Sequence, residues 1–195
     1  MPIKNDTELA IAVASASQHL QDIHDFTQRV DRDDAKVRFP RGVLKTSTEY
    51  RAICPSYLDH DKASSCAYAF MHLDMLWWMT KRTEITLTAR EMVLKSAMIA
   101  LATITEAVLT IPGQAGFGPS AQFKDRLNSA VQRNFIDGSD RDELSKMWDN
   151  RNHVHLKRLE KSEFGKYGHN DVDLPRAALD RMLPALVKWH EGRKA

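Results

Sequence analysis

The stretch from Asp140 to Leu159 constrains the fold most, because its apolar residues repeat with the period of an α-helix. On a helix these residues form one stripe that should face a core or another chain: Leu144, Met147, Trp148, Val154 and Leu159. Two other residues, Arg151 and His155, lie along the middle of this stripe, one turn apart. A guanidinium keeps its charge, so burying it without a partner is costly. The stripe therefore predicts both a packed helix and a special role for this pair.

Helical patterns also account for most of the remaining chain. Apolar residues from Leu9 to Val30 recur at alternating steps of four and three, which predicts a long helix capped by Asp6 or Thr7 that packs on one neighbour. Further helices are expected over residues 61–82, from a capping box at Thr88 and Glu91 to residue 110, and from residue 119. With a last helix over residues 173–190, the sequence predicts an all-α bundle of about seven helices.

Bulk composition places this chain among single-domain globular proteins. Its 195 residues, 43% hydrophobic and 28% charged, suit one soluble domain over residues 1–195. The net charge of +2 neither requires nor excludes a nucleic-acid partner. The two cysteines, Cys54 and Cys66, are too few for a disulfide scaffold and lack the spacing of a metal site. With no signal peptide or membrane span in the pattern, we expect a cytoplasmic protein without a membrane partner.

Residues 35–57 form a basic connector in which the helical pattern stops. Pro40 and Gly42 break any helix, and the apolar residues around them suggest an extended arm or a small hairpin. Basic residues dominate from residue 36 to residue 51 and are opposed there only by Glu49: Lys36, Arg38, Arg41, Lys45 and Arg51. Such a segment can follow a phosphate backbone, with Arg38 and Arg41 as RNA contacts. A solvated connector is the alternative, and it is the commoner role of a charged loop.

The run Arg151-Asn152-His153-Val154-His155, with Leu144 and Trp148 upstream, resembles the signature of the HEPN superfamily. That signature is an arginine, often followed by Asn, Asp or His, with a histidine a few residues on near a helix end. A polar loop and a last amphipathic helix follow it. Here residues 156–170 and 173–190 match these parts, so the resemblance covers residues 140–192. This sequence departs from the usual four to six intervening residues, because only three separate Arg151 from His155. The i,i+4 spacing still keeps both on one helix face.

The chemistry of these residues suits RNA cleavage. His155 can exchange a proton near neutral pH, and the planar fork of Arg151 matches a phosphate whose charge grows during reaction. Asn152 can orient either group. The matching reaction is attack of a 2′-hydroxyl on its own phosphodiester, which needs no metal and no other cofactor. One histidine cannot readily act as base and acid in one step, so we expect a homodimer with a composite site. The resemblance implies the same, because HEPN ribonucleases commonly pair their motifs across a two-fold interface.

The loop after the motif adds positive charge where RNA would bind. From Arg151 to His169, Arg151 included, the sequence contains five basic residues and two acidic ones. The predicted RNA contacts outside the catalytic residues are Lys157, Arg158, Lys161 and Lys166. Tyr167 and Phe164 are candidates for stacking on bases. The loop is equally consistent with ordinary protein surface.

Two other hypotheses remain open beside a toxin-like or defence endoribonuclease with an antitoxin partner. One is a non-catalytic HEPN-like module that binds a nucleotidyltransferase or joins a larger assembly. The other is a helical scaffold in which Arg151 and His155 form a buried, satisfied polar network. A metal site is not expected, because His153 and His155 would point about 200° apart on a helix.

Overall fold

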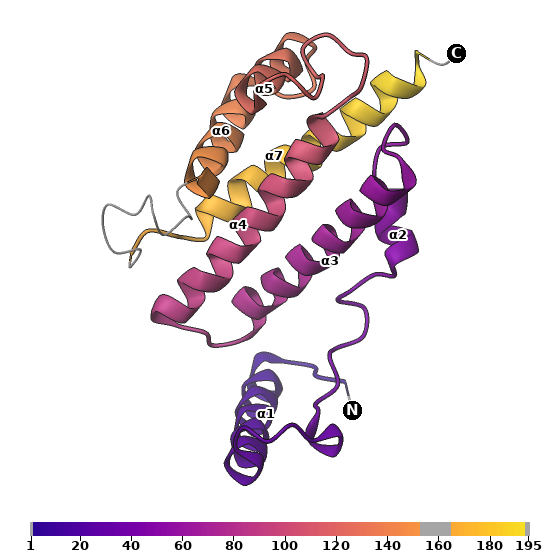
Figure 1. Ribbon diagram of the computed structural model, residues 1–195. Coiled ribbons are helices and arrows are strands. Elements are labelled where there is room, and N and C mark those ends of the chain that lie inside the picture. The colour runs from indigo at the N-terminus through magenta and orange to yellow at the C-terminus, as the bar shows by residue number, and fades with distance from the viewer. Residues whose placement is uncertain (1, 153–164, 194–195) are drawn as a thin grey trace. The chain divides into compact units, whose positions relative to one another are not determined.

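The computed structural model describes residues 2–152 and 165–193 (Figure 1). Over these ranges the chain forms seven α-helices and one short 3₁₀ helix, and it contains no strand. The helices are α1 (Asp6–Thr27), η1 (Asp33–Ala35), α2 (Ser47–Ala52), α3 (His60–Arg82), α4 (Leu87–Leu109), α5 (Phe123–Gln132), α6 (Gly138–Asn152) and α7 (Asn170–Glu191). The predicted all-α bundle of about seven helices is therefore confirmed.

The chain divides into two compact units, Met1–Arg41 and Gly42–Ala195. The first unit contains α1 and η1. Helix α1 is capped by Asn5, whose side chain accepts the backbone N–H of Glu8 at 2.9 Å, and not by Asp6 or Thr7 as expected. No residue of α1 is buried, and Leu20, in the middle of its predicted seam, is 52% exposed. The pattern thus correctly predicts a helix, while the neighbour that it anticipates stays a prediction.

Helix α4 is the centre of the second unit and runs alongside α3, α6 and α7 (Figure 1). Eleven of its residues are buried, and its small side chains include the buried Ala97, Ala100 and Ala102. Small residues let neighbouring helices approach closely. By length and composition α4 is also apolar enough to cross a membrane, the one such helix within the described ranges. More than half of that stretch is buried in the protein, as expected for a core helix.

Helix α2 replaces part of the arm or hairpin expected before residue 51. The side chain of Thr46 accepts the backbone N–H of Glu49, and the Glu49 carboxylate accepts the backbone N–H of Thr46. This reciprocal capping box satisfies two helix donors, and burial of Tyr50 fixes the short helix against α3. The basic residues before it also have more acidic neighbours than expected, because Lys36 pairs with Asp33 at 2.7 Å and with Asp31 at 3.3 Å.

The N-terminal end of α4 differs from the capping box predicted at Thr88 and Glu91. Thr86, and not Thr88, precedes α4. The buried Glu91 carboxylate accepts the backbone N–H groups of Gly165 and Lys166, at 2.9 and 3.2 Å. Glu91 therefore fixes the start of the described segment that leads into α7.

At α6 the cap is Asp137, whose carboxylate accepts the backbone N–H of Asp140 at 2.8 Å. The Asp140 carboxylate is buried and pairs with Arg181 of α7. Asp140 of α6 thus joins this helix to α7. The carboxylate also raises the pKa of Arg181 through their hydrogen bonds.

Candidate functional site

The predicted site begins in the last turn of α6, where Arg151 and Asn152 are both partly buried. The Arg151 guanidinium lies over the ring of Trp148, 4.8 Å from its centroid, and its Nη1 donates to Asn152 Oδ1 at 3.2 Å. Trp148 stacks in turn on Phe123 of α5, with centroids 4.0 Å apart and planes 9° apart. Two packed aromatic rings therefore support the guanidinium, an arrangement that favours a cation electrostatically.

Within residues 2–152 and 165–193, Arg151 forms no ion pair with an acidic residue. Two arginines of α7 differ in this respect, because Arg176 pairs with Asp180 and Arg181 pairs with Asp140. Only one of the guanidinium nitrogens of Arg151 donates within the described ranges. The remaining donors of its planar fork suit a phosphate or carboxylate of a ligand.

The cations beside this helix end are already paired. Lys124 of α5 pairs with Asp149 at 2.8 Å, and Lys146 pairs with Asp171 of α7 at 2.9 Å. The Asp171 carboxylate raises the pKa of Lys146 through a hydrogen bond and through its charge. These contacts fix α6 against its neighbours, and they leave Arg151 as the candidate cation of the motif in the part of the chain that the structure describes.

Most of the other predicted site residues lie outside the described residues. They are His155, Lys157, Arg158 and Lys161, together with His153 and Phe164. The structure thus brings Arg151 and Asn152 together, and the pairing of Arg151 with His155 stays a prediction. The same holds for RNA binding by the three basic residues.

The predictions for Lys166 and Tyr167 have different outcomes. Lys166 is exposed; its backbone N–H is bound by Glu91, and its ammonium lies 5.6 Å from the Tyr167 ring centroid. Tyr167 itself is only 4% exposed, so the expectation that it stacks on RNA bases is wrong. Its ring belongs to the hydrophobic core instead. Lys166 remains a candidate RNA contact.

Arg38 and Arg41, the predicted RNA contacts of the connector, are both exposed. They follow η1 in the first unit, whereas Arg151 belongs to the second. Their role in RNA binding stays a prediction.

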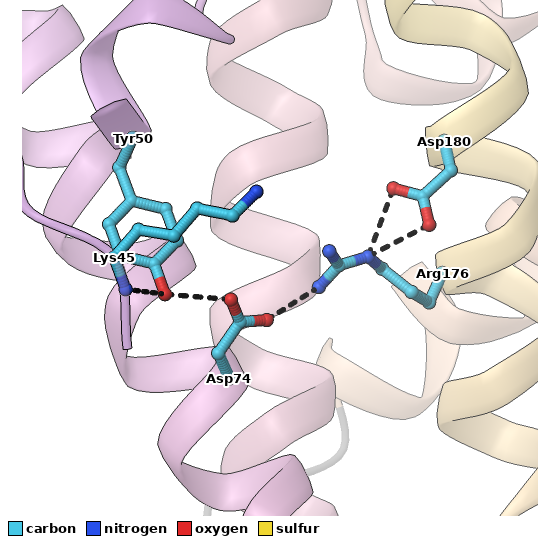
Figure 2. A network of polar contacts seen from close by, with 5 residues as sticks. All are labelled: Lys45, Tyr50, Asp74, Arg176 and Asp180. Carbon is cyan, nitrogen blue, oxygen red and sulfur yellow. Dashed lines mark hydrogen bonds and ion pairs between the residues drawn. The ribbon is translucent and has the colours of Figure 1, made fainter. Parts of the chain in front are cut away.

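A second polar feature, which the sequence pattern did not predict, joins α2, α3 and α7 (Figure 2). The Tyr50 hydroxyl donates to Asp74 at 2.7 Å, and Arg176 Nη1 donates to the same carboxylate at 3.4 Å. Arg176 Nε also donates to both oxygens of Asp180, and the backbone N–H of Lys45 donates to the Tyr50 hydroxyl. Burial, followed by the hydrogen bond to Asp74, raises the pKa of Tyr50 to about 12. Tyr50 is therefore a neutral donor at physiological pH.

This network borders a cavity of about 540 Å³ that includes Trp77 and Trp78 in its wall. Trp77 lines this cavity and is 46% exposed. Asp74 does indicate a polar contact in the sequence, because a carboxylate in an apolar helix needs a partner. Its partners lie 24 and 102 residues away in sequence, so no local pattern identifies them.

The described ranges contain no group of three or more His, Cys, Asp or Glu residues placed to hold a metal ion. No protein-family model matches this chain, and neither the curated proteins nor the solved structures contain a match to it.

Proposed function

We propose that this protein is a metal-independent endoribonuclease of HEPN type, with Arg151 and His155 as catalytic residues and Asn152 in support. One observation carries the proposal. The Arg151 guanidinium is held against Trp148 at the end of α6, without an acidic partner in the described ranges. A purely structural arginine in a partly buried position normally meets a carboxylate or several carbonyls. An arginine with unused donors is suited to a phosphate.

In the proposed reaction, the 2′-hydroxyl of one nucleotide attacks the adjacent phosphorus. A base takes the proton of the 2′-hydroxyl, while an acid protonates the departing 5′-oxygen. The products are a 2′,3′-cyclic phosphate and a 5′-hydroxyl. Arg151 opposes the charge that grows on the nonbridging phosphate oxygens, and Asn152 orients the guanidinium through its bond to Nη1. His155 transfers the proton, since an imidazole titrates near neutral pH.

The base and the acid act on opposite sides of the phosphorus, so the proposal includes a homodimer in which two copies of the motif form one site. RNA would be held by the basic residues after α6, among which the exposed Lys166 belongs to the described residues. We further propose a cytoplasmic toxin or defence effector. A protein that cuts cellular RNA needs an antitoxin or another control on its activity.

The test expresses the wild type and three variants from an inducible promoter, and follows growth and total RNA. His155→Ala and Arg151→Lys should restore growth and leave RNA intact, because one removes the proton carrier and the other removes the planar fork. Arg141→Ala is the matched control, since Arg141 is on the same helix and, among the described residues, has its ion pair with the adjacent Asp142. The control should remain toxic. RNA cleaved by purified protein in EDTA should carry 2′,3′-cyclic phosphate ends.

Two outcomes would contradict this proposal. If the wild type leaves RNA intact but binds it or a nucleotidyltransferase, the protein is a binding module. If Arg151→Lys unfolds the protein, its arginine has a structural role. Thermal unfolding of each variant separates these cases.

A further inference from the structure

The cavity between α3 and α7 has no part in the proposed cleavage reaction, yet its walls combine groups that bind ligands. Its volume of about 540 Å³ is within the range of small-molecule sites. It is lined from three helices, with Trp77 on α3, Ala97 on α4 and Arg176 on α7.

The aromatic part of the wall is partly exposed to solvent. Trp77 lines the cavity with 46% of its surface exposed, and the guanidinium of Arg82 lies 6.0 Å from its ring centroid. A tryptophan that is half exposed on a cavity wall offers a flat apolar face to a planar ligand. Stacking on this face would remove apolar surface from water without moving the helix.

The polar part of the wall has both donors and acceptors, held in place by the network in Figure 2. Arg176 uses Nη1 and Nε for Asp74 and Asp180, which leaves its Nη2 without a partner in the ranges that the structure describes. Asp180 is 53% exposed and has oxygen lone pairs left for further donors. The side chains of Arg176 and Asp74 are themselves 30% and 26% exposed. A wholly apolar ligand would cover these charged groups without replacing their water, which is unfavourable.

The charges of the cavity nearly cancel. Its wall contains three aspartates, Asp74, Asp173 and Asp180, and two arginines, Arg82 and Arg176. Asp173 is also paired with Lys81 at 2.8 Å. An anionic group placed beside the three aspartates would be repelled, and a polyamine would be repelled by the two arginines. The balance therefore favours a planar group that is itself neutral and has donors and acceptors on its edge.

We propose that this cavity binds a nucleobase, stacked on Trp77 with its edge directed to Arg176 and Asp180. Arg82 has no ion pair among residues 2–152 and 165–193, and it is available to the phosphate attached to the base. The base belongs either to a free nucleotide or to a residue of single-stranded RNA. The site adds base binding to the proposed ribonuclease, but it does not depend on cleavage.

The experiment titrates the full-length His155→Ala variant, which cannot cleave by the proposed mechanism. Tryptophan fluorescence is followed during addition of the four ribonucleoside 5′-monophosphates, a single-stranded hexaribonucleotide of each base, and ribose 5-phosphate. We expect saturable quenching by at least one nucleotide and none by ribose 5-phosphate, which lacks a base. Tighter binding of a hexamer than of its monophosphate would identify RNA as the source of the base. Equal binding would identify the free nucleotide.

Calorimetry on two variants then locates the site. Trp77→Ala should weaken binding by about 5- to 100-fold, the range expected when one stacking ring is removed. Tyr68→Ala is the matched control, because Tyr68 is an aromatic residue of α3 that is 61% exposed and does not line the cavity. It should bind like the parent. Absence of binding, or equal weakening by both substitutions, would overturn the proposal. Growth arrest by the wild type would be unaffected by that result, so the two proposals fail separately.

Discussion

Helices α1 and α4 have almost the same length, 22 and 23 residues, but very different surroundings. Helix α1 carries a regular apolar seam and has no buried residue. Helix α4 is apolar on most sides, and eleven of its residues are buried. The periodicity of the sequence therefore determines which face of a helix is apolar. How much of that face is buried depends on neighbouring elements, which the sequence of the helix itself does not specify.

The strongest way to test this contrast is to truncate one leucine in each helix. Leu101 of α4 is 0% exposed, so Leu101→Ala should lower the free energy of unfolding by about 2–5 kcal/mol. Leu20→Ala, at a position 52% exposed, should lower it by less than about 1 kcal/mol. Urea unfolding followed by circular dichroism measures both. A large loss for Leu20→Ala would mean that another surface covers α1 in solution.

The next effect concerns Glu91, a buried carboxylate of α4 that binds two backbone N–H groups far along the chain. Glu91→Ala leaves both donors without this acceptor, so we expect a loss of about 1–3 kcal/mol in the free energy of unfolding. Amide hydrogen exchange at Gly165 and Lys166 should also become faster. Unchanged exchange at both amides would show that other acceptors replace Glu91.

A pH dependence should distinguish the two units, because the first unit contains no tyrosine. In the second unit, the pKa of Tyr50 is raised from 10.0 to about 12. The unfolded state then loses this proton first, so stability falls as pH rises from about 10 to about 12. Tyr50→Phe should make this decrease shallower. Some decrease will remain, since burial also raises the pKa of Tyr57. An identical slope in the variant would contradict the role of Tyr50.

The smallest expected effect is at the cap of α1. Asn5→Ala removes an acceptor for the Glu8 backbone N–H and should destabilise α1 by about 1 kcal/mol. Because Asn5 caps locally, the main unfolding transition of the second unit should not move. Helicity at 222 nm in the absence of denaturant should fall slightly. A shift of the main transition would show that the two units unfold together.

The sequence predicts the helices of this protein better than the contacts between them. Leu144 and Met147 are buried as their spacing indicates, because the helical period assigns them to one face of α6. The short helix α2 was missed, since its capping box stands beside residues that also suit an arm.

Contacts between side chains far apart in the sequence are harder to predict than the helices. Arg126 of α5 is buried although it is charged, with Nη1 donating to the Thr110 hydroxyl and Nη2 to the Pro119 carbonyl. For the candidate site, the sequence singled out Arg151 from its place in an apolar stripe. For the cavity, the sequence indicates only that Asp74 needs a partner, because its partners Tyr50 and Arg176 come from α2 and α7.

The small side chains of α4 have a practical consequence for the cavity. Ala97 is 2% exposed and forms part of the cavity wall. Ala97→Leu would therefore occupy part of the cavity volume without replacing any charged residue or aromatic ring that lines it. Replacing this methyl group by isobutyl would narrow the cavity permanently, so the variant would test the shape of the site separately from its chemistry.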